Sequence, residues 1–175
     1  IAPQGSLADR LEQEVFVVRV GVKSQLLEKL LSDYSGTVLI FTRTKHGAKR
    51  IAKLVKVMGH PSAELHSNKS LAQRKHALQG FKDGRYRVLV ATDIAARGID
   101  VNDIELVINY DLPENPEDYV HRIGRTGRAG KAGKAISFAS PDQVWQLKKI
   151  ERLTRSRLQQ SAVPSQLPEV RVVEK

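Results

Sequence analysis

The sequence predicts an α/β domain built on a mostly parallel β-sheet, with helices covering both faces. Strand-like and helix-like segments alternate along the chain, which is the pattern of parallel α/β folds. Two strand-like segments, 37–42 (TVLIFT) and 87–92 (RVLVAT), have the apolar character of strands buried on both faces. At 175 residues, the chain is long enough for one compact domain with a substantial core.

The first four elements follow from valine-rich and leucine-rich patterns. Segment 14–20 is expected to be a strand because it is rich in valine and a glycine follows it. In 23–34, leucines at i, i+1, i+4 and i+5 share one face of a helix. After the strand at 37–42, segment 44–58 places alanine, isoleucine and valine inward and lysines outward, which predicts a second helix.

The middle of the chain continues the alternation. A short strand is expected at 62–66, and a helix over 70–83 begins with a serine–glutamine capping pattern. Strands follow at 87–92 and at 105–110 (ELVINY). Because the sheet should be mostly parallel, functional residues are expected in the loops that leave the carboxyl ends of the strands.

The last third is less regular. A helix should begin near Asn115-Pro116, with proline at its first position. A strand is expected at 134–139, followed by a capped helix that extends from Pro141 towards Leu158. These elements predict an interdomain linker over 1–12, a domain over 13–158 and a loosely ordered tail over 159–175.

Composition narrows the class of partner. The formal net charge is +10, which favours a polyanionic partner, most often nucleic acid. A basic protein that is simply soluble is the alternative explanation of the charge. Aromatic residues make up 5% of the chain, which argues against base stacking as the main mode of binding. The absence of cysteine excludes thiolate metal sites and suits a cytoplasmic protein. No apolar run approaches the ~20 residues that span a bilayer, so no membrane partner is expected.

The most informative segment is 121–130 (HRIGRTGRAG), which spaces three arginines three residues apart among glycines. Guanidinium groups match phosphate geometry, and glycines let a phosphate approach the backbone. Arg125 and Arg128 could therefore act as arginine fingers on a γ-phosphate held by another surface. A nonspecific phosphate-binding loop is the alternative. The chain has no Walker A loop and no Asp-Glu sequence to hold magnesium, and its five histidines show no metal-ligand spacing.

Segment 92–101 (TDIAARGIDV) carries a second set of candidates. Arg97-Gly98 pairs a phosphate-binding group with a flexible joint, and Asp100 suits a ribose hydroxyl, although a turn or an internal salt bridge would also explain it. Arg74 lies in the first turn of its expected helix, where a cation opposes the helix dipole unless an anion is bound there. The alternative for Arg74 is a solvated surface charge.

Three segments resemble motifs of the DEAD-box RNA helicases, and the wording is closest to the bacterial RhlE-like group. VLIFTRTK at 38–45 is similar to motif IV, RVLVATDIAARGIDV at 87–101 to motif V, and YVHRIGRTGRAG at 119–130 to motif VI. The phrase VINYDLP at 107–113 also belongs to the family. The resemblance covers residues 13–155 in unbroken order. It implies a RecA-like, three-layer α/β/α fold and the second lobe of an ATP-dependent RNA helicase.

The resemblance implies a role for each candidate residue. Arg125 and Arg128 would reach the phosphates of ATP, which is held with Mg²⁺ on a first, N-terminal RecA-like lobe of the same chain, and Asp100 would hold the ribose. His121 would couple the ATP site to the interdomain contact. RNA backbone contacts would come from six residues: Thr42, Arg43, Arg74, Thr92, Arg97 and Gly98. Such contacts carry little sequence preference.

Two positions depart from the family pattern. Ser67 stands where the family usually has glycine, and Leu71 where it usually has glutamine, while Arg74 is retained. The change at Leu71 is expected to loosen the contacts around Arg74. The chain begins at Ile1 without a methionine, as a piece of a longer protein would. Because the chain has no Walker A loop and no Asp-Glu sequence to hold magnesium, the isolated lobe is expected to have no ATPase activity. A non-enzymatic RNA-binding module and a basic ribosome-associated protein are the alternative readings.

Overall fold

The computed structural model describes residues 11–97, 101–127 and 132–170. The strands are β1 (Leu11–Val17), β2 (Val38–Phe41), β3 (Ser62–Leu65), β4 (Val88–Ala91), β5 (Leu106–Asn109), β6 (Gly133–Ala139) and β7 (Gln159–Ser161). The helices are α1 (Lys23–Asp33), α2 (Lys45–Val57), α3 (Leu71–Lys82), α4 (Asp93–Ala96), α5 (Pro116–Ile123) and α6 (Val144–Thr154), with 3₁₀ turns η1 (Val20–Val22) and η2 (Pro141–Gln143).

The seven described strands form one sheet in the order β3-β4-β2-β5-β6-β1-β7. Every described pairing is parallel, which confirms the prediction of a mostly parallel sheet. The strands that precede the predicted site, β2 and β4, are neighbours in register from Val38 opposite Val88 to Phe41 opposite Ala91. Their carboxyl ends, and that of β5 on the other side of β2, therefore meet at one edge of the sheet.

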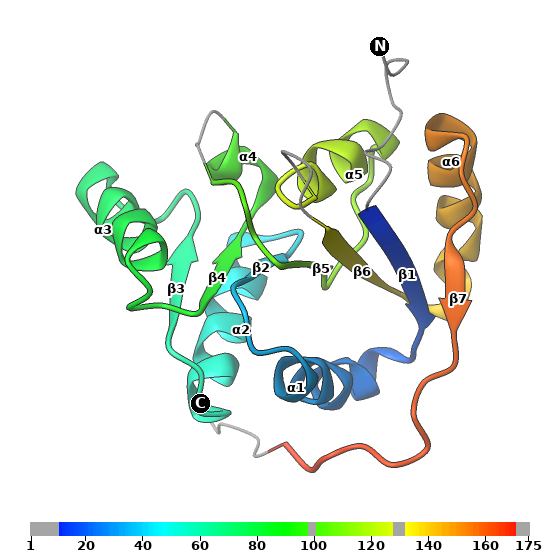
Figure 1. Ribbon diagram of the computed structural model, residues 1–175, viewed down its shortest axis with the longest axis horizontal. Helices are drawn as coiled ribbons and strands as arrows, with labels where there is room; N and C mark the ends of the chain where they lie inside the picture. The colour runs from blue at the N-terminus through cyan, green and yellow to red at the C-terminus, as the bar shows by residue number, and fades with distance from the viewer. Residues whose placement is uncertain (1–10, 98–100, 128–131, 171–175) are drawn as a thin grey trace.

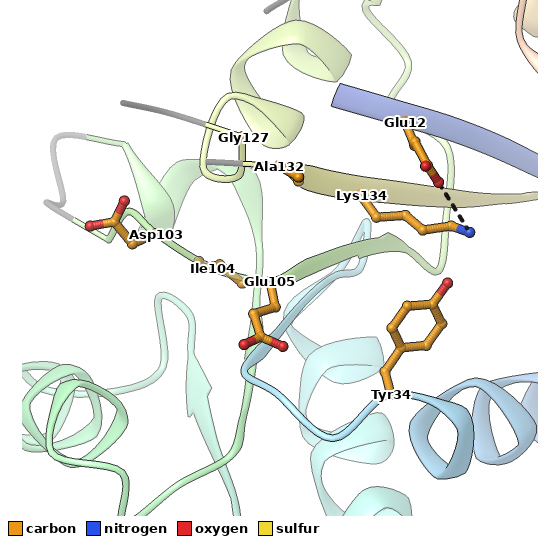
Figure 2. Close-up of a pocket in the computed structure, with 9 residues that line it drawn as sticks. Glu12, Tyr34, Asp103, Ile104, Glu105, Gly127, Ala132 and Lys134 are labelled. Atoms are coloured by element: carbon orange, nitrogen blue, oxygen red, sulfur yellow. Dashed lines mark ion pairs between the residues drawn. The ribbon is translucent and has the colours of Figure 1, made fainter. Parts of the chain in front are cut away.

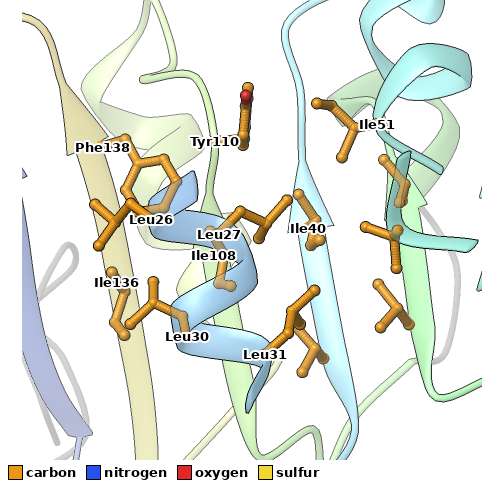
Figure 3. Packing of buried hydrophobic residues seen from close by; sticks show 14 of the residues in the cluster. Leu26, Leu27, Leu30, Leu31, Ile40, Ile51, Ile108, Tyr110, Ile136 and Phe138 are labelled. Carbon is orange, nitrogen blue, oxygen red and sulfur yellow. The ribbon is translucent and has the colours of Figure 1, made fainter. Parts of the chain in front are cut away.

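Helices cover both faces, so the domain has three layers (Figure 1). On one face, the apolar sides of α1 and α2 pack on alternate residues of the central strands. Figure 3 shows the leucines of α1, Leu26 to Leu31, lying over Ile40, Ile108 and Ile136 of three neighbouring strands. The opposite face carries α3 and α4 at one end and α5 and α6 at the other. The leucine and valine periodicities of the sequence thus produce the predicted α/β/α sandwich.

Local capping follows the sequence closely at two helix starts. Ser70 Oγ accepts a hydrogen bond from the N–H of Gln73, and the Gln73 side chain accepts one from Ser70 N–H, so the predicted capping box is confirmed. Asn115 caps α5, which has proline in its first turn as expected. Such caps satisfy N–H groups that have no partner inside the helix.

The structure differs from the expected boundaries at three places. β1 begins at Leu11, inside the expected linker, and β7 lies inside the expected loose tail, where it pairs with β1. Val163 and Leu167, beyond β7, pack against the core cluster that contains the leucines of α1. The last helix ends at Thr154 rather than near Leu158, because Arg155 adopts a left-handed backbone conformation with φ of 53°.

Candidate functional site

One carboxylate joins the loops that leave β2 and β5. Asp111 Oδ2 accepts a hydrogen bond from the backbone N–H of Arg43 (3.0 Å), and its Oδ1 lies 3.3 Å from the Nζ of Lys23. The buried ammonium of Lys23, at the start of α1, also donates to the carbonyl of Tyr110 (2.9 Å). The backbone of Arg43 is therefore held by a carboxylate that Lys23 also contacts, while the side chain of Arg43 remains exposed.

Thr42 is fully buried, unlike Arg43 beside it. Its Oγ1 donates to the carbonyl of Thr44 (3.1 Å), and its N–H donates to the carbonyl of Ala91 at the end of β4 (3.0 Å). Thr44 in turn caps α2 by accepting from the N–H of Gly47 (3.0 Å). Thr42 thus shapes the turn between β2 and α2, with its hydroxyl already engaged inside the protein.

The candidates after β4 surround the one-turn helix α4. Thr92 precedes α4 and donates its N–H to the carbonyl of Leu65 (3.2 Å), and Arg97 follows α4 with a largely exposed side chain. Arg97 Nη2 donates to Oδ1 of Asp118 on α5 (3.4 Å). The same oxygen lies 4.0 Å from Nδ1 of His121, one turn later on α5. Asp118 therefore lies between a predicted RNA contact and the predicted interdomain histidine.

Arg122, the first arginine of segment 121–130, is buried and fully engaged. Its side chain is 1% exposed and forms two parallel hydrogen bonds with the carboxylate of Asp93, at 2.6 and 2.7 Å. It also donates to the side-chain oxygen of Asn109 (3.2 Å) and to the carbonyl of Asp111 (2.7 Å), and it lies over the ring of Phe41. Arg122 therefore joins α5, the start of α4 and the end of β5, as charge-assisted bidentate pairs do.

Arg125 is half-buried beyond the end of α5. Its Nη2 donates to the carbonyl of Ala96 in α4 (3.1 Å), and its own carbonyl accepts from the N–H of Ile104 (3.2 Å). The hydroxyl of Thr126 donates to the carbonyl of Ile104 as well. The arginine-bearing loop is therefore fastened to α4 and to the segment leading into β5.

Close backbone approach explains two glycines of this region. Gly127 has a φ of 72°, a conformation that other residues rarely adopt. A Cβ on Gly133 would lie 2.2 Å from the backbone nitrogen of Gly127. The first residue of β6 must therefore be glycine for the arginine-bearing loop to pass beside it.

Of the remaining predicted site residues, Arg74 lies within the described ranges. Arg74 lies in the first turn of α3, and its Nε is buried without a hydrogen-bond partner among the residues described. That donor suits an added anion. Gly98, Asp100 and Arg128 lie outside the described residues, so their predicted roles remain predictions.

A pocket of about 450 Å³ lies at the amino ends of β1, β5 and β6, beside Gly127 (Figure 2). Its walls carry three carboxylates, from Glu12, Asp103 and Glu105, and one ammonium, from Lys134. Lys134 is paired with Glu12 (3.7 Å) and with Glu14 outside the pocket (3.0 Å). Burial opposes its charge, but hydrogen bonds to Tyr34 and Glu14 raise the pKa of Lys134 above its ordinary value. The excess of carboxylates makes this pocket unfavourable for a phosphate.

Sequence reasoning did not identify the three aspartates that organise the site. Asp111 and Asp118 contact residues that were predicted to belong to the site, and Asp93 holds Arg122. A signal existed for two of them: Asp93 directly follows a buried strand, and Asp118 precedes His121 by three residues, one turn of a helix. No local pattern pairs Asp111 with Arg43, because 68 residues separate them.

Neither a metal-binding cluster nor a membrane-spanning helix is found in the described part of the chain. No group of three or more histidine, aspartate or glutamate side chains there is arranged to hold a metal ion. None of the helices described is both long and apolar enough to cross a membrane.

Comparisons with known proteins agree with this architecture. Residues 22–130 match the family described as Helicase conserved C-terminal domain. The chain is 40% identical to the ATP-dependent RNA helicase RhlB of Pseudomonas aeruginosa, over 95% of this chain and 42% of RhlB. It spans less than half the length of the curated relatives it matches. Membership of the RhlE-like subgroup stays a prediction.

Solved structures show the same fold. The chain is similar to the E. coli DEAD-box protein SrmB, solved bound to regulator of ribonuclease activity A, with a TM-score of 0.84, 30% identity and coverage of 95% of this chain and 99% of that one. It is also similar to S. cerevisiae Dbp5, solved bound to RNA and ADP BeF3, with a TM-score of 0.79 and 32% identity over 90% of this chain and 42% of that one.

Proposed function

Because the chain belongs to the helicase C-terminal domain family and to the DEAD-box proteins within it, we propose that it is the second lobe of an ATP-dependent RNA helicase. In this proposal the lobe binds the RNA backbone and supplies arginine side chains to ATP held on an N-terminal lobe of the same chain. Closure of the two lobes on both ligands then separates short RNA duplexes.

Three cationic side chains from different elements support RNA binding. Arg43 follows β2, Arg74 begins α3 and Arg97 follows α4. Arg43 and Arg97 are exposed, and Arg74 has an unpartnered buried donor. Phosphate contacts of this kind position a nucleic acid without reading its bases, so little sequence preference is expected. Thr42 and Thr92 would act by shaping the turns that present these groups, with Gly98 allowing close approach.

The nucleotide contacts are proposed for the arginine segment. Arg125 and Arg128 would stabilise the negative charge that develops on the phosphates during hydrolysis, Asp100 would bind the ribose, and His121 would face the first lobe. ATP, when bound, supplies the phosphoryl transfer chemistry, and Mg²⁺ is assigned to the first lobe. The guanidinium of Arg125 fits a phosphate in chemistry and is already held at one edge by Ala96.

The main support for the proposal is a set of contacts that join the segment proposed to bind RNA to the segment proposed to contact ATP. Segment 93–97 and segment 118–125 are joined by three contacts: Arg122 with Asp93, Arg125 with the carbonyl of Ala96, and Arg97 with Asp118. A ligand that moves one segment must therefore move the other. This linkage is what a lobe needs in order to couple nucleotide and RNA binding.

The test uses the intact protein with both lobes on one chain. Arg128→Ala should lower RNA-stimulated ATP turnover on the order of 10³-fold, with RNA affinity nearly unchanged, because an arginine finger acts on the transition state. Arg43→Ala should weaken RNA binding, and Lys49→Ala, which alters an exposed cation on α2, should change neither. An equal loss of RNA affinity with Arg128→Ala would make that residue an RNA ligand. RNA binding by the intact protein without ATP turnover would favour the non-enzymatic module.

A further inference from the structure

The outward face of α6 combines an exposed tryptophan with a row of cations. Trp145 is 55% exposed, and Lys148, Lys149 and Arg152 follow it at i+3, i+4 and i+7, so all four side chains share one face of the helix. We call these four residues the α6 basic face. Two further exposed arginines, at positions 155 and 157, follow directly after the helix.

This face is not needed to hold α6 in place. The helix is anchored by its opposite side, where Leu147 and Ile150 pack with Tyr119 and Ile123 of α5. Trp145 belongs to none of the apolar clusters of the described core. A single exposed apolar residue needs no explanation by itself. Trp145, however, shares its face of the helix with three exposed cations.

Acidic partners for the cations on and after α6 are missing from the described part of the chain. Within the described residues, neither the three cations of the α6 basic face nor Arg155 and Arg157 form an ion pair. Glu151, the acidic residue of α6, instead accepts a hydrogen bond from the N–H of Leu158 (3.0 Å). Lys149 Nζ lies 4.8 Å from the centre of the Trp145 ring. These positive charges therefore repel one another, and the binding of a polyanion to this surface would relieve the repulsion.

We propose that the α6 basic face is a second RNA-contact surface, which binds single-stranded RNA outside the segment held by the arginines near α3 and α4. The inference rests on the proposed function. A flat aromatic ring beside phosphate-binding cations is the combination that binds single strands, because every base can stack on the ring. An acidic peptide would match the charge but would leave the exposed ring without a stacking partner.

The position of α6 determines what this surface adds. α3, which carries Arg74, and α6 lie at opposite ends of the long axis of the domain (Figure 1). An RNA strand that reaches both surfaces must therefore be longer than one held near α3 and α4 alone. The α6 basic face would give the lobe a preference for duplexes with a single-stranded extension.

The chain contains one tryptophan, so its fluorescence reports on Trp145 alone. We expect oligouridine of about 20 nucleotides to quench this fluorescence, with the same half-saturation as RNA anisotropy, whereas about 6 nucleotides should bind with little quenching. Trp145→Ala should weaken binding of the longer RNA on the order of tenfold. Binding of the longer RNA by anisotropy without any change in Trp145 fluorescence would overturn the inference and leave the proposed function standing. If neither anisotropy nor fluorescence detected RNA binding, both the inference and the proposed function would be overturned.

A matched charge control is available on α2. Lys49, Lys53 and Lys56 form an exposed row at i, i+4 and i+7, with no aromatic among them. Replacing the three cations of the α6 basic face with glutamine should weaken binding of the longer RNA, and it should reduce the slope of log affinity against log salt by about 2. The triple glutamine variant of the α2 row should have a much smaller effect. Equal losses from both variants, or equal quenching by polyglutamate, would refute a specific RNA surface.

Discussion

Removing the carboxylate of Asp93 is the most direct test of the contact that joins α4 to α5. In the folded domain the guanidinium of Arg122 is 1% exposed, and Asp93 is its charged partner. Asp93→Ala would leave that positive charge buried, with two short hydrogen bonds lost and only the neutral acceptors of Asn109 and Asp111 remaining. Breaking a buried pair from one side typically costs about 3–5 kcal/mol of unfolding free energy.

The opposite substitution should cost less. Arg122→Met removes the buried charge itself, and the side chain of Asp93 is 26% exposed and can be hydrated. The remaining cost, on the order of 1–3 kcal/mol, comes from acceptors that lose their donor. In the double variant the penalty of Asp93→Ala should largely disappear, because no charge is left to compensate. The two losses should therefore be strongly non-additive.

Equilibrium unfolding in urea measures these differences. With a slope of about 2 kcal/mol/M, Asp93→Ala should lower the unfolding midpoint by roughly 2 M. Arg97→Ala is the matched control, because Arg97 also faces a carboxylate but its side chain is 70% exposed. Its effect on stability should stay below about 1 kcal/mol. The reasoning fails if Asp93→Ala costs less than about 1 kcal/mol, or if the losses of Asp93→Ala and Arg122→Met add.

Two further predictions concern the opposite, amino edge of the sheet. Burial, and then the nearby Arg87, lower the pKa of His60 from its ordinary 6.5, so the unfolded chain takes up this proton more readily. The free energy of unfolding should therefore fall as the pH drops below 6.5. When urea midpoints are measured against pH, His60→Gln should flatten this part of the curve. An unchanged pH profile in the variant would contradict the prediction. Gly133→Ala would place a Cβ 2.2 Å from a backbone nitrogen of the arginine-bearing loop and should cost about 1–3 kcal/mol by thermal unfolding. Gly21→Ala, where nothing lies within 4 Å of the added Cβ, should leave the stability nearly unchanged. If Gly133→Ala changed the stability as little as Gly21→Ala, the arginine-bearing loop would have to move aside easily.

The core strands could be predicted because their signal is local. Segments 37–42 and 87–92 contain β2 and β4, whose residues are all buried. Apolar runs this short are typical of a strand covered on both faces, since a buried helix is usually longer. The helices on the α1 face were equally predictable, since one apolar side is enough to place each against the sheet. In both cases the residues that determine the element are adjacent in the sequence.

β7 and α4 carry no comparable signal. Gln159–Ser161 is polar and becomes a strand through pairing with β1, more than 140 residues earlier, at the edge of the sheet. Asp93–Ala96 is a single helical turn, too short to show a period. It forms where Asp93 is held by Arg122 of α5. Elements that depend on distant partners cannot be read from their own residues.

The three arginines of segment 121–130 also could not be told apart from their own sequence. Their regular spacing suggests a single phosphate-binding row, yet α5 ends at Ile123, between the first and the second arginine. Arg122 is still helical and faces the sheet, whereas Arg125 follows the turn and reaches α4. The end of the helix, rather than the spacing, separates a buried arginine that joins three elements from those proposed to act on a ligand. Arg122→Lys should therefore disturb folding first, because a lysine cannot form the paired contacts with Asp93.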